Sequence, residues 1–453
     1  MFTHFKTYIT LLLIGLTTMA VAEQKPLITA QTSTLSNGLK IIIVPNGIAP
    51  VVSIGVVYNV GTADDPLDQV GLSHFLEHMM FKGTKQVPGA LFNKLILQHG
   101  GQNNALTEFD FTLYYTTISL EYLDFILKLE ADRMRNLTFT RDEVLSEMGV
   151  VLEERRMRLD NNPFGMSYEL YLRALHPHHP YGVHPIGYPH HIKKYTFDSV
   201  RAHYDTWYRP NNATVIIVGK ITMEIAKPII EKYFSSIKST PIPARIRPQN
   251  PPREGATQTI TQYNKRNSLV MIRYAYDAPN FNSDLGKKHY HALKVLAHVL
   301  GGTNTTDFYY QMVERRKLAI DVSCDYHGDA IDPQEFSIEV TAPPHADIPL
   351  LKEEVKNFIT SIVKNGTSED SLNRAKNDLI AKLAYLKDGT ESLLYILAEY
   401  TAKGFTIDDI NAWAKHINNV TMNDVKEAAT LVLGVSPAVT MEVYPEKKDA
   451  KAA

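Results

Sequence analysis

Cysteine is nearly absent from this sequence, and neither sign of charge is in excess. Cys324 is the single cysteine among 453 residues, which excludes a disulfide framework within the chain and a zinc cluster built on thiolates. Any bound metal would need nitrogen and oxygen ligands. Lysine and arginine number 47 and aspartate and glutamate 49, so the formal net charge is −2. This balance gives no electrostatic reason to expect nucleic acid or an anionic membrane as the main partner.

Long apolar runs are also scarce. Beyond the N-terminus no stretch reaches the roughly 18 apolar residues that span a bilayer, so we expect no stable membrane insertion. At the N-terminus, Lys6 precedes an apolar run over residues 8–19, which is followed by small residues up to Ala22. This order is typical of a secretory signal peptide, here residues 1–22, and predicts an exported protein, periplasmic or else extracellular. An uncleaved N-terminal anchor is the alternative.

The remaining composition, 44% hydrophobic and 21% charged, is that of an ordinary globular protein, and the length suggests about two to four domains. The clearest boundary is the segment 238–257, which holds five prolines. Because proline fixes φ and removes a hydrogen-bond donor, we predict an extended linker there, between domains at 23–237 and 258–445. The charged residues 446–453 are expected to form a frayed tail.

The two halves follow the same order of expected elements. Each opens with two β-type runs, at 39–44 and 51–60 in the first half and at 257–263 and 268–276 in the second. Each later has a long helix that opens on a capping-box-like sequence, at Thr140 and at Thr367. This order predicts an α+β fold of two homologous domains, each with helices packed on a largely antiparallel sheet.

The two long helices differ in charge. Counted from Thr140 and Thr367, Glu147 corresponds to Arg374, and Glu154 corresponds to Ala381. We therefore expect an acidic site on this helix in the first half alone.

The residues that carry chemistry lie in the segment 71–84, which reads GLSHFLEHMMFKGT. On a helix, positions i, i+3 and i+4 share one face, so His74 and His78 can bind one zinc ion while Glu77 flanks the open coordination position. Zinc lowers the pKa of a bound water to about 7. A neighbouring carboxylate can accept the water's proton during attack on a carbonyl and return it to the leaving amine. A solvated helix with two incidental histidines is the alternative interpretation.

A third ligand is needed, and the best candidates lie on the helix that follows Thr140. Glu147 and Glu154 are two helical turns apart and share a face, whereas Glu153 is rotated by about 100°. We predict Glu154 as the ligand and Glu147 as the residue that orients a histidine. An exchange of these two roles is the main alternative.

The segment 71–84 resembles the zinc motif of the pitrilysin/insulinase family of metallopeptidases, the inverzincins, which includes the mitochondrial processing peptidase. In that family the third ligand is a glutamate at the end of a Val-Val-x-Glu-Glu-type run, and here 75 residues separate His78 from Glu154 in the run 150–154. Further matches lie at 100–107, 112–115, 179–182, 207–211 and, more weakly, 300–302.

The resemblance implies a zinc endopeptidase with one Zn²⁺ per chain and with two homologous domains that form half of a clamshell. It also implies that an extended peptide substrate adds as a strand to a sheet edge beginning near Asn104, in contact with Asn104, Ala105 and Thr107. The alternative is that Asn104 and Thr107 merely complete a turn. A non-catalytic or weakly active family member, acting as a peptide-binding or assembly subunit, is the alternative function.

One departure from the family pattern points to a partner. Val313 and Ile320 stand where the family carries an Arg and a Tyr that contact substrate, and Arg315 and Arg316 are out of phase. The resemblance to two-subunit bacterial relatives implies a second family chain that supplies this pair. A homodimer cannot, because both copies lack the pair; Arg315 or Tyr326 is the alternative source within the chain.

A histidine-rich stretch covers residues 176–191. A second metal site there is conceivable, but four prolines interrupt the stretch, and we expect a solvated loop. The histidines are His176, His178, His179, His184, His190 and His191.

Overall fold

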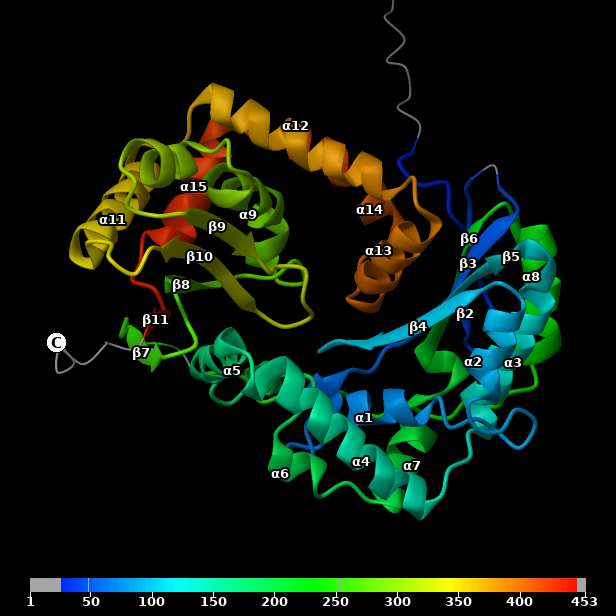
Figure 1. Cartoon of the computed structure of the whole chain (residues 1–453). Coiled ribbons are helices and arrows are strands. Elements are labelled where there is room, and N and C mark those ends of the chain that lie inside the picture. Colours follow the sequence, from blue (N-terminus) through cyan, green and yellow to red (C-terminus); the bar gives the residue numbers. More distant parts are fainter. Residues whose placement is uncertain (1–25, 48, 252, 254, 446–453) are drawn as a thin grey trace, which may run out of the picture.

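The computed structural model describes residues 26–47, 49–251, 253 and 255–445. The predicted signal peptide (1–22) and the charged tail (446–453) lie outside these residues, as do residues 23–25. Two units, each a sheet with helices, lie side by side in a C-shaped arrangement (Figure 1). Among the described residues, no helix combines the length and the apolar character that crossing a bilayer requires.

The first unit is built on a six-stranded sheet in the order β1-β2-β6-β3-β5-β4. All neighbouring pairs are antiparallel except β2 and β6. Its strands are β1 (Gln31–Thr34), β2 (Lys40–Pro45), β3 (Val51–Tyr58), β4 (Gln102–Thr107), β5 (Thr112–Ser119) and β6 (Ala213–Gly219). Its helices are α1 (Leu72–Met79), α2 (Leu91–Gln98), α3 (Leu123–Asn136), α4 (Arg141–Arg155), α5 (Pro163–Leu175), α6 (Pro189–Ile192), α7 (Phe197–Trp207) and α8 (Met223–Phe234).

The second unit is built on a five-stranded sheet in the order β7-β11-β8-β10-β9, with β7 and β11 as its parallel pair. Its strands are β7 (Gln258–Asn264), β8 (Val270–Ala278), β9 (Asp321–Tyr326), β10 (Gln334–Ala342) and β11 (Val439–Pro445). Its helices are α9 (Asp284–Gly301), α10 (Asp307–Tyr309), α11 (Ile348–Asn365), α12 (Glu369–Leu386), α13 (Thr390–Ala402), α14 (Ile407–Asn419) and α15 (Met422–Leu433).

The two sheets have the same topology, as the predicted duplication requires. The order β2-β6-β3-β5-β4 in the first repeats as β7-β11-β8-β10-β9 in the second. Helix α1 follows β3 as α9 follows β8, and α3, α4 and α5 correspond in order to α11, α12 and α13. The expected α+β fold of two similar units with largely antiparallel sheets is confirmed.

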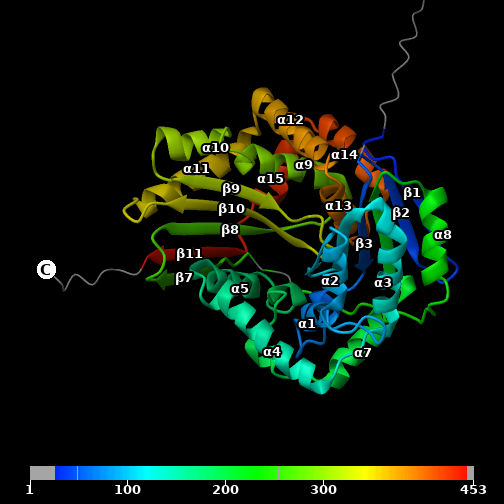
Figure 2. The same cartoon turned by 45° about the vertical axis from the view of Figure 1, so that its right-hand side comes forward.

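Each unit contributes one helix to the sheet of the other. The leucines of α13, including Leu394 and Leu397, are buried against β2, β3, β5 and β6 of the first unit. In return, α5 buries Tyr171 and Leu172 against β8 and β11 of the second unit. In Figure 2, α5 lies on the face of the second sheet opposite to α9, α11 and α15. The two units therefore share their hydrophobic cores at two places.

The start of one long helix differs from the prediction by one residue. Thr140 caps α4 as expected: its side chain accepts a hydrogen bond from the backbone of Glu143, whose carboxylate accepts one from Thr140. On α12, however, the cap is Ser368 rather than Thr367, and it accepts from the backbone of Ser371. Either hydroxyl could serve as a cap, and the chain uses the later one.

The one-residue shift of the cap changes which residues of α4 and α12 correspond to each other. Counted from the true caps, Glu147 corresponds to Ala375 and Glu154 corresponds to Lys382, so the pairing with Arg374 and Ala381 was wrong. Neither new counterpart is acidic, and the expectation that this helix is acidic in the first half alone is unaffected.

The proline-rich segment between α8 and β7 holds no helix or strand in its described residues. The side chain of Arg247, from this segment, is 5% exposed and pairs with Asp64 at 2.9 Å and Asp110 at 2.7 Å in the first unit and with Asp332 at 2.9 Å in the second. The segment is thus anchored to both units. We retain 238–257 as the proposed linker.

The shared core at α13 predicts a large effect of truncation. Leu397 is fully buried, and Leu397→Ala removes its contacts and leaves a cavity. We expect a loss of about 2–5 kcal/mol in the free energy of unfolding, measured by urea denaturation. Leu97→Ala, at a site that is 65% exposed, is the matched control and should cost under about 0.5 kcal/mol. Equal effects of the two changes would contradict the packing described for α13.

Candidate metal centre

The first element of the site is the short helix α1, which is held rigidly at its start. The carboxylate of Asp65 accepts hydrogen bonds from the backbone of Gly71 at 2.8 Å and of Ser73 at 3.0 Å, which satisfies free N–H groups at the helix N-terminus. Gly71 has φ +104°, and a Cβ there would lie 2.7 Å from the hydroxyl of Tyr195. With Phe75 buried beneath the helix, the opposite side presents the predicted ligands.

Helix α4 packs against α1 and brings the third predicted ligand to the two histidines. One ligand atom from each of His74, His78 and Glu154 lies within 4.8 Å of the others. Oε2 of Glu154 is 3.1 Å from Nε2 of His78 and 3.7 Å from Nε2 of His74. No second group of metal-ligating side chains in the described part of the chain meets the same geometry.

The chemistry of these residues fits a divalent cation. Oε2 of Glu154 is buried and receives no hydrogen bond of normal geometry from the described residues. Burial and the neighbouring His78 lower the pKa of His74 to about 3, so its imidazole is neutral at pH 7. Burial opposes protonation of His78, but its hydrogen bond to Glu147 and the nearby carboxylate of Glu154 raise its pKa to about 9. Two imidazoles and one carboxylate are a common ligand set for catalytic zinc.

Glu147 lies on the far side of His78 from Glu154. Its Oε1 is 2.9 Å from Nδ1 of His78, and its Oε2 pairs with Lys82. The hydrogen bond from His78 is the main reason that the pKa of Glu147 falls to about 2. Contact with Nδ1 leaves Nε2 of His78 facing Glu154, so this geometry favours Glu147 as the orienting residue and Glu154 as the ligand.

Glu77 stands beside the ligands and is held by β4. Burial raises the pKa of Glu77, while a hydrogen bond from Oγ1 of Thr107 to Oε2, at 2.6 Å, opposes that rise. The side chains of Glu77, His74 and His78 line a cavity of about 1050 Å³. Glu154 and residues 104–108 of β4 and its turn line the same cavity, so all the predicted site residues except Glu147 meet there.

The strand β4 lies at an edge of its sheet. It pairs with β5 on one side and with no other described strand. Asn104 and Ala105 are in regular strand pairing, opposite Tyr115 and Tyr114, and Thr107 ends the strand. The segment is therefore more than a completed turn, and its free edge faces the cavity.

The histidine-rich stretch is not the solvated loop that we expected. His176, His179 and His191 are buried, and the stretch includes the short helix α6. His176 contacts Asn250 of the proline-rich segment, and Nε2 of His179 is 3.2 Å from Asp332 of the second unit. The prolines do interrupt regular structure, and His178 and His190 are exposed, but His176 and His179 are buried by contacts with the proline-rich segment and the second unit.

The positions discussed for the missing Arg and Tyr lie around the start of β9. Val313 packs partly against the second core, and Ile320 is 45% exposed. Arg316 pairs with Glu354 at 2.9 Å, and the hydroxyl of the buried Tyr326 donates to the carbonyl of Pro279. Tyr326 is thus occupied in the core, which weighs against it as a substitute.

Three contacts of the site were not anticipated from the sequence. They are the cap of α1 by Asp65, the hydrogen bond from Thr107 to Glu77, and the ion pair of Arg158 with Oε1 of Glu154 at 2.9 Å. The last has a sequence signal, because an i, i+4 pair of opposite charges meets on a helix. The contact of Thr107 with Glu77 joins segments whose proximity only the fold creates, whereas Asp65 reaches the start of α1 across a loop of a few residues.

Comparison with known families agrees with these observations. A profile described as "Insulinase (Peptidase family M16)" matches residues 40–175, and one described as "Peptidase M16 inactive domain" matches residues 194–379. The chain belongs to the peptidase M16 family. The first profile spans the motif on α1 and the ligand candidate on α4, and the second covers most of the unit in which the described residues hold no such metal group.

Relatives extend over nearly the whole chain. The zinc protease PqqE of Helicobacter pylori is 26% identical over 417 residues, which cover 92% of this chain and 93% of the relative. The crystal structure of a protease from Helicobacter pylori superposes with a TM-score of 0.85 at 26% identity, over 92% of this chain and all of that one. The periplasmic protease PqqL from Escherichia coli has a similar fold, with a TM-score of 0.77 at 20% identity, over 91% of this chain and 47% of the longer one. This M16 chain thus has relatives named as zinc proteases.

The ligand assignment predicts which side chains retain metal. His74→Ala, His78→Ala and Glu154→Ala should each remove zinc, measured by elemental analysis of the purified protein, because two ligands hold zinc weakly. Glu153→Ala, one residue away and exposed, is the matched control and should keep one zinc per chain. Full zinc in Glu154→Ala together with loss in Glu147→Ala would transfer the ligand role to Glu147.

Proposed function

We propose that this chain is an exported zinc endopeptidase that hydrolyses peptide bonds in extended peptides or unfolded segments. The observation that carries the proposal is the position of Glu77. Its carboxylate lies beside the converging atoms of His74, His78 and Glu154, in a cavity open to a free strand edge. A structural metal site is closed by four protein ligands, whereas here three ligands leave a position for water.

Different residues of the chain have different roles in the proposed reaction. Zinc, when bound, supplies a Lewis acid that lowers the pKa of water and polarises the substrate carbonyl. Glu77 accepts the proton of the attacking water and returns it to the nitrogen of the leaving amine. Thr107 holds Oε2 of Glu77, so Oε1 is the oxygen left to face the water. Burial raises the pKa of Glu77, which strengthens its carboxylate as a base.

The free edge of β4 supports an extended substrate. A peptide that adds as a strand satisfies the unpaired backbone groups of β4, and this pairing depends little on side chains. Asn104 and Ala105 would pair with its main chain, and Thr107 would contribute by orienting Glu77. The peptide bond nearest the end of β4 would then lie over the metal ligands.

The export and the partner rest on separate observations. Export rests on the sequence of residues 1–22. The partner rests on Val313 and Ile320, which offer no side-chain hydrogen bond to substrate. The fold also supports a partner. The first half of PqqL alone matches this chain with a TM-score of 0.77, so a unit of this fold occurs in PqqL together with a second half. We propose a second M16 chain that supplies the Arg and the Tyr.

The proposed role of Glu77 predicts the behaviour of one variant. Glu77→Gln should keep zinc and fold but lower kcat by about 10²–10⁴-fold, because an amide cannot accept the proton of water. Cleavage of an internally quenched peptide measures kcat, and elemental analysis measures zinc. Glu224→Gln, the same change at an exposed glutamate of α8 that does not line the cavity, is the control and should retain activity. Near-normal cleavage by Glu77→Gln would overturn the mechanism, and absence of chelator-sensitive cleavage in any assembly would favour a non-catalytic subunit.

The missing pair predicts dependence on a partner. The isolated chain should cleave an unstructured peptide poorly, and titration with a second M16 chain that carries the Arg and Tyr should raise the rate. Loss of such a donor typically costs about 10²–10³-fold. The control is a partner in which both side chains are replaced by alanine. Full activity of the chain alone, unchanged by the partner, would contradict the split site and point to Arg315.

A further inference from the structure

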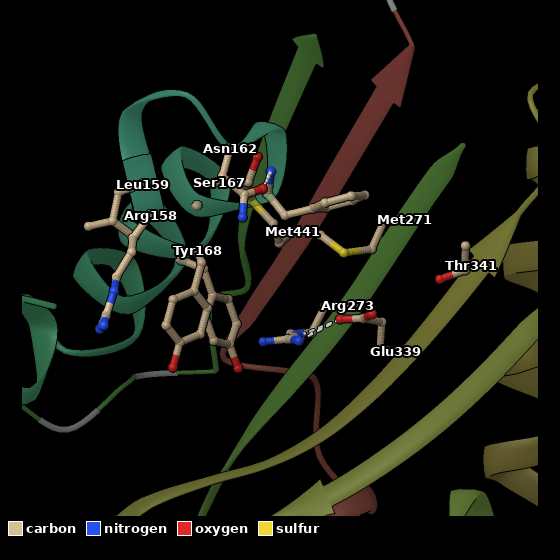
Figure 3. A pocket seen from close by; sticks show the side chains of 13 residues that line it. Arg158, Leu159, Asn162, Ser167, Tyr168, Met271, Arg273, Glu339, Thr341 and Met441 are labelled. Carbon is tan, nitrogen blue, oxygen red and sulfur yellow. Dashed lines mark hydrogen bonds and ion pairs between the residues drawn. The ribbon is translucent and has the colours of Figure 1, made fainter. Parts of the chain in front are cut away.

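A second cavity lies between the two units, next to the metal centre. Its volume is about 440 Å³. One wall is formed by residues of α5 and of the π-helical turn Arg156–Asp160, and the other by strands β8, β10 and β11 of the second sheet. In Figure 3, Arg158 and Tyr168 come from the helical side, and Arg273 and Glu339 come from the strands opposite. The exchange of α5 between the units creates this cavity.

Part of the cavity lining is apolar or aromatic. Met271 and Met441 come from neighbouring strands, and Phe164 and Tyr168 face the cavity from α5. Phe164 and Tyr168 are both more than one-third exposed, which is unusual for large rings beside an apolar wall. Methionine side chains adapt to differently shaped apolar partners. The cavity is therefore suited to a large apolar or aromatic group.

The charged groups at the cavity are already paired. Nε of Arg273 donates to Oε2 of Glu339 at 2.8 Å, and its guanidinium lies 5.0 Å from the ring centre of Tyr171. Arg158 pairs with Glu154 at 2.9 Å. An acidic ligand would have to compete with these carboxylates, whereas an apolar ligand leaves both pairs intact.

Arg158 joins this cavity to the metal centre. Its side chain lines both cavities, and its partner Glu154 is a predicted metal ligand. Arg158 is thus the side chain that lies between a peptide bound on β4 and the second cavity. The turn after β4 also reaches the second unit, where Asp110 accepts a hydrogen bond from the backbone of Ile331 at 3.2 Å.

We propose that this cavity, defined by Met271, Met441, Phe164 and Tyr168, is a specificity subsite that takes one bulky apolar or aromatic side chain of the peptide, on the N-terminal side of the cleaved bond. The inference rests on the proposed function and deepens it. The direction follows from β4, which runs toward the second unit. Antiparallel pairing is the more stable arrangement, and an antiparallel peptide has its N-terminal residues nearest that unit.

A set of peptides that differ in the position of one aromatic residue tests the subsite. The set carries a single Phe, moved one position at a time through a background of Ala, Ser and Gly, and cleavage is followed by mass spectrometry with the zinc-loaded chain and its partner if one is required. We expect Phe at one position N-terminal to the cleaved bond to raise kcat/KM about tenfold or more over Ala. Leu and Met should act like Phe, and Asp should not.

Two variants change the cavity in opposite ways. Met271→Trp fills it and should abolish the advantage of Phe over Ala while leaving cleavage of the Ala peptide within about twofold. Tyr168→Ala widens it and should reduce the advantage of Phe. Leu170→Ala is the matched control, because Leu170 is exposed on the same helix and does not line the cavity.

A binding measurement separates this inference from the proposed function. In the Glu77→Gln background, fluorescence anisotropy should show tighter binding of the Phe peptide than of the Ala peptide by a similar ratio, and Met271→Trp should remove the difference. If the difference is present but no peptide is cleaved by the wild type, the subsite stands and the peptidase function fails. If peptides are cleaved without preference on the N-terminal side, or with a preference that neither cavity variant alters, the subsite is overturned.

Discussion

The position of the two units relative to each other depends on one buried cation, the side chain of Arg247. The guanidinium of Arg247 lies among Asp64, Asp110 and Asp332, so a residue of the connecting segment pairs with both units at once. Removal of one member of a buried ion cluster leaves the others unpaired and is strongly destabilising. The ion cluster acts together with helices α5 and α13, each of which packs on the sheet of the other unit. The helices contribute apolar contacts between the units, and the cluster contributes directional ion pairs. Helix α5 forms one wall of the cavity beside the metal centre, so the shape of that cavity depends on the contact between the units.

The geometry of the metal centre depends on the rigidity of the two packed units. Its proposed ligands lie on α1 and α4; Asp65 accepts hydrogen bonds at the start of α1, and Thr140 caps α4. Glu147 of α4 orients His78, and Thr107 of a third element, β4, holds Glu77. Precise placement of this kind is what general-base catalysis requires, since proton transfer depends on hydrogen-bond distance.

We propose that duplication of the fold leaves the chemistry to the first unit and the recognition of the peptide to the second. Both sheets share one topology, but the positions of α12 that correspond to Glu147 and Glu154 hold Ala375 and Lys382. The second unit instead offers the paired Arg273 and the methionines of β8 and β11 to the space beside the metal centre. A fold present twice can thus separate bond cleavage from recognition of the peptide.

The sequence by itself determined the local features: the helical spacing of His74, Glu77 and His78, the cap at Thr140, and the repeat of strands and helices that predicts two similar α+β units. These depend on periodicity and short-range hydrogen bonds, which a sequence displays directly. Only the tertiary structure decided which residues meet. Thr107 on Glu77, the contacts that bury His176 and His179, and the crossing of α5 and α13 all join segments far apart in the chain. Such contacts follow from the packing of whole elements, and no local pattern encodes them.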